Sequence, residues 1–130
     1  MQAKNIKNIS VIGAGFMGCG IAQVFATKKY NVLLYNRSHP GDTGFFSKRV
    51  ENIRSILSTM ARKGVGAESE IEAIISRIKT TTSMDEATSG AQFVIENVAE
   101  NLELKQQVFQ ELDQLCPPET ILATNTSVMS

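Results

Sequence analysis

The pattern of hydrophobic and polar positions predicts short buried strands separated by amphipathic helices. Apolar, β-branched runs typical of buried strands occur at 6–12, 32–35, 78–83, 91–98 and 120–127. Apolar residues recur every three or four positions, as on one helix face, over 16–28, 50–60, 67–78 and 101–116. Residues 84–90 are expected to form a short helix or turn, and the Pro-Pro pair at 117–118 ends the last helix.

This alternation predicts an α/β fold with a doubly wound parallel sheet and right-handed crossovers. We expect the strand order 3-2-1-4-5. The helices over 50–60 and 67–78 follow each other directly across the "KGVG" at 63–66, so a helical hairpin is expected between the second and third strands. Without repeats or an internal linker, residues 1–130 are expected to form one domain.

Composition and charge narrow the function classes. The chain has 130 residues, and its thirteen basic and thirteen acidic residues cancel, which argues against nucleic acid as a partner. No apolar run approaches the length of a membrane span, so no membrane partner is expected. Cys19 and Cys116 are isolated and lack metal-ligand spacing. We therefore expect reduced thiols, no metal site and a cytoplasmic location.

A glycine-rich stretch, "VIGAGFMGCG", follows the first predicted strand and opens the first predicted helix. In that context a Gly-x-G-x-x-Gly spacing indicates a dinucleotide site of the Rossmann type. Gly13 would permit the tight turn, Gly15 would let the backbone approach a pyrophosphate, and Gly18 would allow close packing of helix on strand. The helix N-terminus would face the phosphates. The alternative is a glycine-rich turn that binds no ligand.

Three neighbouring residues have less specific interpretations. Gly20 lies inside the predicted helix and is expected to serve packing only. Phe16 and Met17 either shield the pyrophosphate or belong to the core at the first turn of the helix. The sequence does not decide between these two roles.

The end of the second strand departs from the pattern of NAD enzymes. An acidic residue usually binds the adenine ribose there, but this chain has Asn36, followed by Arg37 and Ser38. Asn36 removes the charge that would repel a 2′-phosphate, and Arg37 could pair with that phosphate. The cofactor is therefore NAD or NADP, with NADP slightly favoured. The alternative is that Arg37 is solvated and Asn36 accepts NAD.

Two later stretches, "FVIENVAENLELKQQVFQELD" and "ILATNTS", carry a resemblance to a known family. From Ile6 to Ser127 the chain resembles the nucleotide-binding domain of L-3-hydroxyacyl-CoA dehydrogenases, especially bacterial 3-hydroxybutyryl-CoA dehydrogenases. The resemblance implies that Gly13, Ala14, Gly15, Phe16, Met17 and Gly18 hold the cofactor pyrophosphate. Asn36 would occupy the place of the family's ribose-binding aspartate. Glu100 and Lys105 would line the nicotinamide side, Asn125 would pack near the nicotinamide, and Ser127 would contact cofactor and substrate.

Each of these later residues also has a structural interpretation. Glu100 could stabilise a helix N-terminus, and Lys105 could lie on a solvated face. Asn125 and Ser127 could serve as turn and cap residues. The carboxyl ends of the fourth and fifth strands adjoin the first strand in the predicted fold, which is where such sheets bind ligands. That convergence favours the site.

The resemblance implies reversible oxidation of a 3-hydroxyacyl thioester by NAD(P), with a histidine as base and a glutamate that orients it. In the family both residues follow the "NTS" strand, whereas this chain ends at Ser130. Its single histidine, His39, lies near the expected adenosine end. We therefore expect a cofactor-binding domain without the C-terminal domain that completes catalysis and dimerisation, inactive by itself.

Several alternatives stay open at this point. The thioester could be carried by coenzyme A or by an acyl carrier protein. The basic residues Arg49, Arg54, Arg62 and Lys63 could contact a carrier phosphate, but a solvated helical face is the favoured interpretation. The chain could instead be a β-hydroxyacid dehydrogenase, whose "GxMG" and "NR" features it shares. A non-catalytic NAD(P)-binding or structural protein is the third interpretation.

Overall fold

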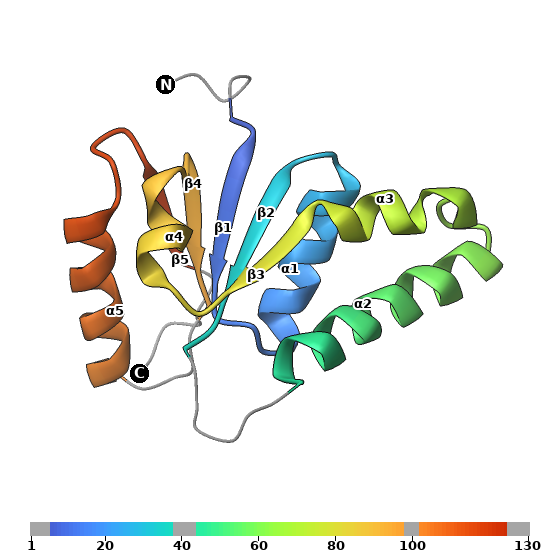
Figure 1. The fold of residues 1–130 in the computed structure, drawn as a ribbon, viewed down its shortest axis with the longest axis horizontal. Coiled ribbons are helices and arrows are strands. Elements are labelled where there is room, and N and C mark those ends of the chain that lie inside the picture. Colours follow the sequence, from blue (N-terminus) through green and yellow to red (C-terminus); the bar gives the residue numbers. More distant parts are fainter. Residues whose placement is uncertain (1–5, 38–43, 98–101, 125–130) are drawn as a thin grey trace.

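A parallel sheet of five strands forms the centre of the molecule, in the order β3-β2-β1-β4-β5. The computed structural model describes residues 6–37, 44–97 and 102–124. The predicted fold class and strand order are confirmed. All strands run the same way, so their carboxyl ends share the lower edge of the sheet in Figure 1. The strands are β1 (Asn8–Ile12), β2 (Asn31–Tyr35), β3 (Ile78–Thr81), β4 (Phe93–Glu96) and β5 (Ile121–Thr124).

Helices cover both faces of the sheet, as a doubly wound fold requires. Helices α1 to α3 pack with one core cluster, and α4 and α5 pack with a second one on the other face (Figure 1). The helices are α1 (Phe16–Thr27), α2 (Phe45–Arg62), α3 (Ile71–Ser76), α4 (Met84–Ser89) and α5 (Leu102–Leu115).

The central strand β1 contributes to both cores because successive side chains point to opposite faces. Ile9 and Val11 join the core beneath α1, whereas Ile12 joins the core beneath α4 and α5. Ser10 is buried on the same face as Ile12, and its hydroxyl donates to the carbonyl oxygen of Ala87 in α4. β1 is thereby fixed on both faces, and the loop that follows it starts from a rigid position.

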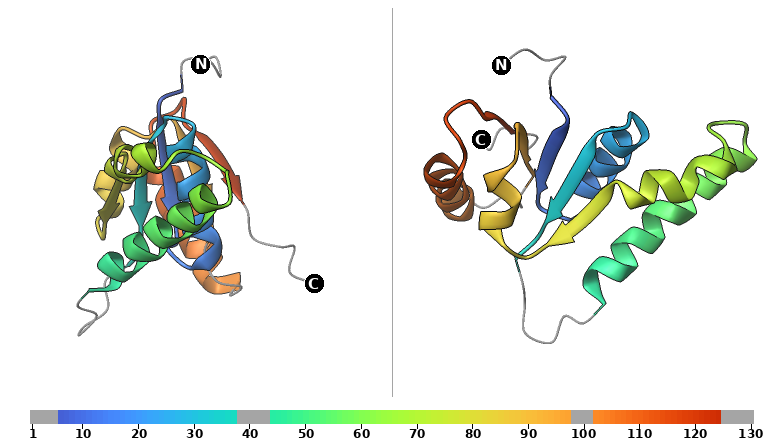
Figure 2. Two further views of the ribbon diagram at one scale, coloured as in Figure 1. Left: turned by 90° about the vertical axis from the view of Figure 1, so that its right-hand side faces the viewer. Right: turned by 45° about the horizontal axis from the view of Figure 1, so that its top comes forward.

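The helical hairpin between β2 and β3 is present, but its second helix is shorter than predicted. The pattern predicts one helix over 67–78, whereas the structure has a 3₁₀ turn (Glu68–Glu70) followed by α3. The helix ends because Ile78 is buried as the first residue of β3, paired with Val32 of β2. Figures 1 and 2 show α2 and α3 extending together beyond the sheet.

The fourth strand is also shorter than the predicted range of 91–98, because it spans only Phe93–Glu96. The predicted first strand begins at residue 6, but β1 begins at Asn8. Such differences of a few residues at element ends do not change the topology, because the paired residues in the centre of each strand are those expected.

Gly18 and Gly20 provide a matched pair of substitutions that tests the packing of α1. A Cβ at Gly18 would lie 1.8 Å from the carbonyl oxygen of Gly13, whereas one at Gly20 meets nothing within 4 Å. We expect Gly18→Ala to lower the free energy of unfolding by about 2–3 kcal/mol, because helix and strand must separate. Gly20→Ala should raise it by about 0.5–1 kcal/mol, because alanine favours the helix. Urea unfolding of both variants measures this, and equal values would contradict the packing described.

Candidate nucleotide-binding site

The loop between β1 and α1 lies at the carboxyl edge of the sheet, where the glycine motif is placed. Gly13 has a φ of 111°, a conformation that side chains rarely adopt. Its amide donates to the carbonyl oxygen of Tyr35 at 2.8 Å, which ties the loop to the end of β2. Gly13 therefore makes the tight turn that the sequence predicts.

The other two motif glycines also differ in what surrounds them. The contact of Gly18 with the Gly13 carbonyl allows α1 to approach the strand closely, as predicted. At Gly15 an added Cβ would meet nothing within 4 Å. Gly15 is the N-cap of α1, and no cap side chain accepts a hydrogen bond from the first amides of the helix. A phosphate can approach there without displacing the chain.

Two interpretations from the sequence are wrong. Gly20 is exposed, and nothing packs where its side chain would be, so packing does not require it. Phe16 is 88% exposed and Met17 is 57% exposed, so neither belongs to the core. Their exposure beside the loop leaves the shielding of a bound cofactor as the remaining interpretation.

Ala14 connects the glycine loop to two other elements. Its amide donates to Oδ1 of Asn36 at 3.0 Å, just after β2. Its carbonyl oxygen accepts from Nε of Arg49 on α2 at 2.9 Å. The loop is therefore held from both sides. Arg49 is a neighbour of the site, although the sequence favoured a solvated helical face for it.

The thiol of Cys19 is the second group near the carbonyl oxygen of Ala14, with its Sγ at 3.5 Å from that oxygen. Burial raises the pKa of this thiol, and the positive charge of Arg49 opposes that shift only in part. Cys19 is therefore a neutral thiol at pH 7 and can act as a weak donor to the loop. The structure has Cys19 and Cys116 as free cysteines, as predicted.

Both the oxygen and the nitrogen of the Asn36 side-chain amide form hydrogen bonds with the backbone. Besides accepting from Ala14, it donates through Nδ2 to the carbonyl oxygen of Arg37 at 3.2 Å. The Arg37 residue is exposed beside it. Asn36 thus fixes the loop in addition to any contact with a ribose, a role that the spacing of the motif does not reveal.

A buried polar cluster joins the ends of β4 and β5 to α5. Glu96 has no exposed surface, and its Oε1 accepts from the hydroxyl of Thr124 at 2.6 Å. Nζ of Lys105, on α5, lies 3.6 Å from the same oxygen, and the Lys105 side chain is only 19% exposed. The interpretation of Lys105 as a solvated face residue is therefore wrong. Glu96 was missed, although its position opposite Thr124 in the sheet register could have indicated the pair.

Several predicted site residues cannot be placed. Glu100, Asn125 and Ser127, which the family resemblance assigns to the nicotinamide side, lie outside the described residues. Ser38 and His39 also lie outside them. Of the residues that the resemblance assigns to the nicotinamide side, Lys105 lies within the described ranges, and Thr124 directly precedes Asn125.

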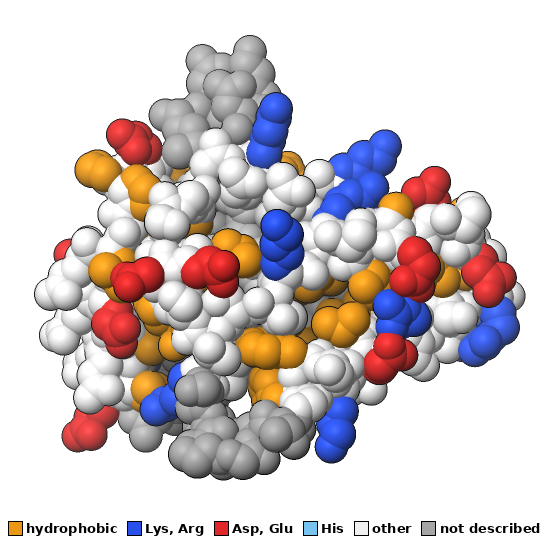
Figure 3. Space-filling view, in the orientation of Figure 1, with side chains coloured by type: hydrophobic (Ala, Val, Ile, Leu, Met, Phe, Trp, Pro, Cys, Tyr) orange, Lys and Arg blue, Asp and Glu red, His pale blue; other side chains and the backbone are white. Residues whose placement is uncertain are grey.

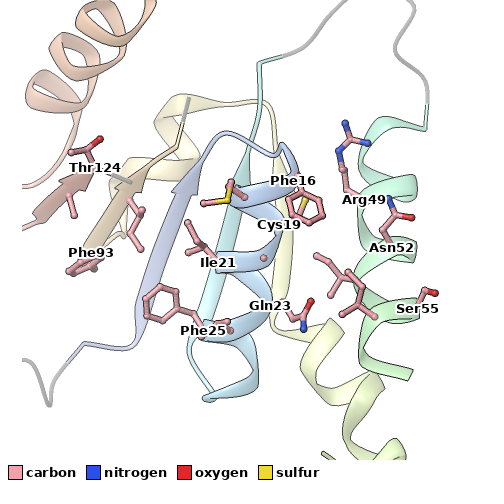
Figure 4. A pocket seen from close by; sticks show the side chains of 17 residues that line it. Phe16, Cys19, Ile21, Gln23, Phe25, Arg49, Asn52, Ser55, Phe93 and Thr124 are labelled. Atoms are coloured by element: carbon pink, nitrogen blue, oxygen red, sulfur yellow. The ribbon is translucent and has the colours of Figure 1, made fainter. Parts of the chain in front are cut away.

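A hollow of about 930 Å³ adjoins the loop on the α1 side of the sheet, between α1, α2 and the strands β4 and β5. Its lining is mostly apolar, and its members include Phe16, Met17 and Arg49. Figure 4 shows Phe16 and Arg49 on facing helices at one end of the hollow, with Phe25 further along α1. Asn36 and Arg37 are not among its described lining residues, so the hollow adjoins the glycine loop without including the end of β2.

The basic residues of the hairpin have different environments. Arg54 forms ion pairs with Glu51 and with Glu72, where Nε lies 2.8 Å from Oε2, and its hydrogen bond lowers the pKa of the Glu72 carboxyl. Figure 3 shows acidic and basic side chains interspersed over this end of the molecule. Arg62 and Lys63 are exposed as expected. Arg49 alone of these four is turned toward the glycine loop.

The described residues contain neither a membrane-spanning helix nor a cluster of metal-ligating side chains. No helix within 6–37, 44–97 and 102–124 is both long and apolar enough to cross a membrane. In the same ranges no three histidine, cysteine or carboxylate side chains lie together as a metal site would need.

A comparison with known protein families identifies the family of this chain. Residues 8–130 match the model of the 3-hydroxyacyl-CoA dehydrogenase, NAD binding domain. The chain belongs to this family. The motif glycines lie on the loop between β1 and α1 and in the first turn of α1, so the fold, the motif and the family agree. The match favours the resemblance to 3-hydroxyacyl-CoA dehydrogenases over the alternative of a β-hydroxyacid dehydrogenase.

Relatives share the sequence over nearly all of this chain but are longer. A probable 3-hydroxybutyryl-CoA dehydrogenase of Bacillus subtilis is 40% identical over 94% of the chain, which covers 41% of that protein. A 3-hydroxyadipyl-CoA dehydrogenase of Escherichia coli is 36% identical over 97% of the chain, which covers 26% of that protein. The chain thus spans less than half the length of these relatives.

Two solved structures of 3-hydroxybutyryl-CoA dehydrogenases are also similar to nearly the whole of this chain. A 3-hydroxybutyryl-CoA dehydrogenase from Escherichia coli K12 superposes with a TM-score of 0.86 and 34% identity, covering 97% of this chain and 26% of the other. An (S)-3-hydroxybutyryl-CoA dehydrogenase from Ralstonia eutropha has a TM-score of 0.86 and 32% identity, covering 97% of this chain and 43% of the other.

The cluster of Glu96, Lys105 and Thr124 leads to a stability prediction. Lys105→Met removes the ammonium group beside a carboxylate that solvent does not reach. We expect the free energy of unfolding to fall by about 2–3 kcal/mol at neutral pH, because a buried charge loses its countercharge. Adding Glu96→Gln removes the negative charge, retains an acceptor for Thr124 and should recover most of the loss. Chemical unfolding measures both, and a change below about 0.5 kcal/mol for Lys105→Met would contradict the ion pair's importance.

Proposed function

We propose that this chain binds NAD(P) at the loop from Gly13 to Gly18, as the cofactor-binding part of a 3-hydroxyacyl thioester dehydrogenase. The observation that carries the proposal is the open space at Gly15, directly before an α1 N-terminus without a side-chain cap. Exposed amides and the helix dipole favour a phosphate at such a position. The family match supports NAD as the cofactor class.

The pyrophosphate would lie against the backbone of Gly13, Ala14, Gly15, Phe16, Met17 and Gly18. Two properties of the loop support this. The tight turn at Gly13 and the close contact at Gly18 hold the loop in one conformation, and preorganisation reduces the entropy lost on binding. Phe16 and Met17 are exposed at the start of α1, where they can cover a bound pyrophosphate.

The nicotinamide end would lie at the carboxyl ends of β4 and β5. Lys105 is held there by Glu96, which supports its assignment to that end. Glu100, Asn125 and Ser127 complete the proposed set, with Ser127 in contact with both cofactor and substrate. The convergence of strand ends beside β1 in this sheet supports the placement.

The substrate is proposed to be a 3-hydroxyacyl thioester of coenzyme A. The printed names of the bacterial relatives, 3-hydroxybutyryl-CoA and 3-hydroxyadipyl-CoA dehydrogenase, support the carrier. When bound, NAD(P) supplies the hydride acceptor, and the residues of this chain bind and orient it. We propose dimerisation through a further domain, as the family resemblance implies.

We propose that the 130 residues bind the cofactor without turnover. Catalysis needs a base for the hydroxyl proton, and the single histidine, His39, follows β2 in the sequence rather than β4 or β5. The oxidation of NADH by a 3-ketoacyl-CoA, with this chain present, tests the statement. Turnover would contradict it.

A side chain at Gly15 should abolish cofactor binding without unfolding the protein. Gly15→Val places a branched group where the pyrophosphate would lie, in space that no atom of the described chain occupies. We expect the affinity for NADH to fall by at least about a hundredfold, while the circular dichroism spectrum is retained. Gly20→Val is the control, because Gly20 also has open space but lies beyond the first turn of α1. Calorimetry that finds equal affinities for the two variants would contradict the proposed site.

The choice between NAD and NADP depends on Asn36 and Arg37. We propose that NADP binds more tightly, because Asn36 is uncharged and the exposed Arg37 beside it can pair with a 2′-phosphate. The preference should weaken with added salt, since the pair is partly exposed. Asn36→Asp should reverse it by about 1–3 kcal/mol, or roughly tenfold to a hundredfold in affinity, because a carboxylate accepts from ribose hydroxyls and repels a phosphate.

Paired titrations with NADP and NAD at low and moderate salt measure this preference. Asp at position 36 retains an acceptor for the Ala14 amide, so the loop should keep its anchor. A preference for NAD in the unchanged chain, or a ratio that Asn36→Asp does not alter, would show that Asn36 only replaces the family's aspartate.

A further inference from the structure

Arg49 is a cation held in a fixed position beside the glycine loop. Its Nε donates to the carbonyl oxygen of Ala14 at 2.9 Å, and the guanidinium carbon lies 4.3 Å from the ring centroid of Phe45. Phe45 and Arg49 lie four residues apart on α2, so they share one helix face. The ring and the loop carbonyl together orient the guanidinium group, which Figure 4 shows at the same end of the hollow as Phe16.

The remaining donors of Arg49 are available for a ligand. An arginine side chain has five N–H donors, and Ala14 uses one of them. Within 6–37, 44–97 and 102–124, the four donors on Nη1 and Nη2 meet no acceptor, and no carboxylate pairs with Arg49. Arg54, one turn further along α2, differs because Glu51 and Glu72 neutralise it.

The positive charge of Arg49 adds to that of the α1 N-terminus. The first turn of α1 contains no acidic residue, and its N-cap Gly15 supplies no side-chain acceptor. The helix dipole contributes a partial positive charge there. A fixed guanidinium group and an open helix N-terminus thus meet at Ala14 and Gly15, and both attract an anion.

We propose that Arg49 binds a phosphate group of the dinucleotide and is an affinity-determining residue of the site. This inference rests on the proposed function. Arginine binds phosphate through paired N–H donors, and the geometry of the group favours this contact over that of a lysine. The phosphate belongs to the pyrophosphate that both cofactors share, or to the 2′-phosphate of NADP.

Titration of Arg49→Met with NADH and NADPH tests the proposal, with Arg54→Met as the matched control on the same helix. We expect Arg49→Met to weaken binding by about tenfold or more, and Arg54→Met to alter it by less than about twofold. Loss of a charge contact also makes the affinity of Arg49→Met less sensitive to salt than that of the unchanged chain. Arg49→Lys should retain part of the affinity and of the salt dependence, because it keeps the charge without the fork.

The two cofactors distinguish the two phosphates. Equal losses for NADH and NADPH assign Arg49 to the pyrophosphate, and a loss confined to NADPH assigns it to the 2′-phosphate. Unchanged affinity in Arg49→Met would overturn the proposal, as would a loss with unaltered salt dependence, since Arg49 would then only fix the loop. If the unchanged chain bound neither cofactor, the proposed function would fail as well. If the unchanged chain and Arg49→Met both bound the cofactors with the same affinity, only the proposed role of Arg49 would be contradicted.

Discussion

The close approach of α1 to the carbonyl group of Gly13 determines where the candidate residues lie. Because Gly18 has no side chain, the helix begins directly above the end of β1, and an added Cβ would lie 1.8 Å from that oxygen. The N-terminus of α1 consequently opens at the carboxyl edge of the sheet, beside the ends of β2 and β4. A helix further from the strand would not present its first amides at that edge.

Ala14 connects the helical hairpin and the end of β2 to the loop that precedes α1. Ala14 donates to Asn36 and accepts from Arg49, so β2 and α2 fix the loop on both sides. The hairpin is therefore structurally linked to the cofactor loop, although most of it extends away from the sheet (Figure 2). At the opposite end of the site, Glu96 links β4, β5 and α5 through buried polar contacts.

The sequence pattern predicted what depends on local periodicity and on the topology it permits. The strand order follows from the alternation of strands and helices, and the glycine spacing located the turn at Gly13 and the contact at Gly18. The pattern did not reveal the contact of Arg49 with Ala14, because these residues lie 35 positions apart and no spacing rule relates them. The length of α3 was also missed, since the pairing of Ile78 in the sheet overrides its helical periodicity.

The central claim, that the loop between β1 and α1 binds the dinucleotide, is tested most directly by amide chemical shifts. Nuclear magnetic resonance spectra of the labelled chain would be recorded as NADH is added. The largest changes are expected at Gly13 to Gly18 and at Asn36, with little change at Gly64 and Gly66 in the hairpin turn. Changes confined to Phe93 and Ile95 in the hollow, or no changes at saturating NADH, would contradict the claim.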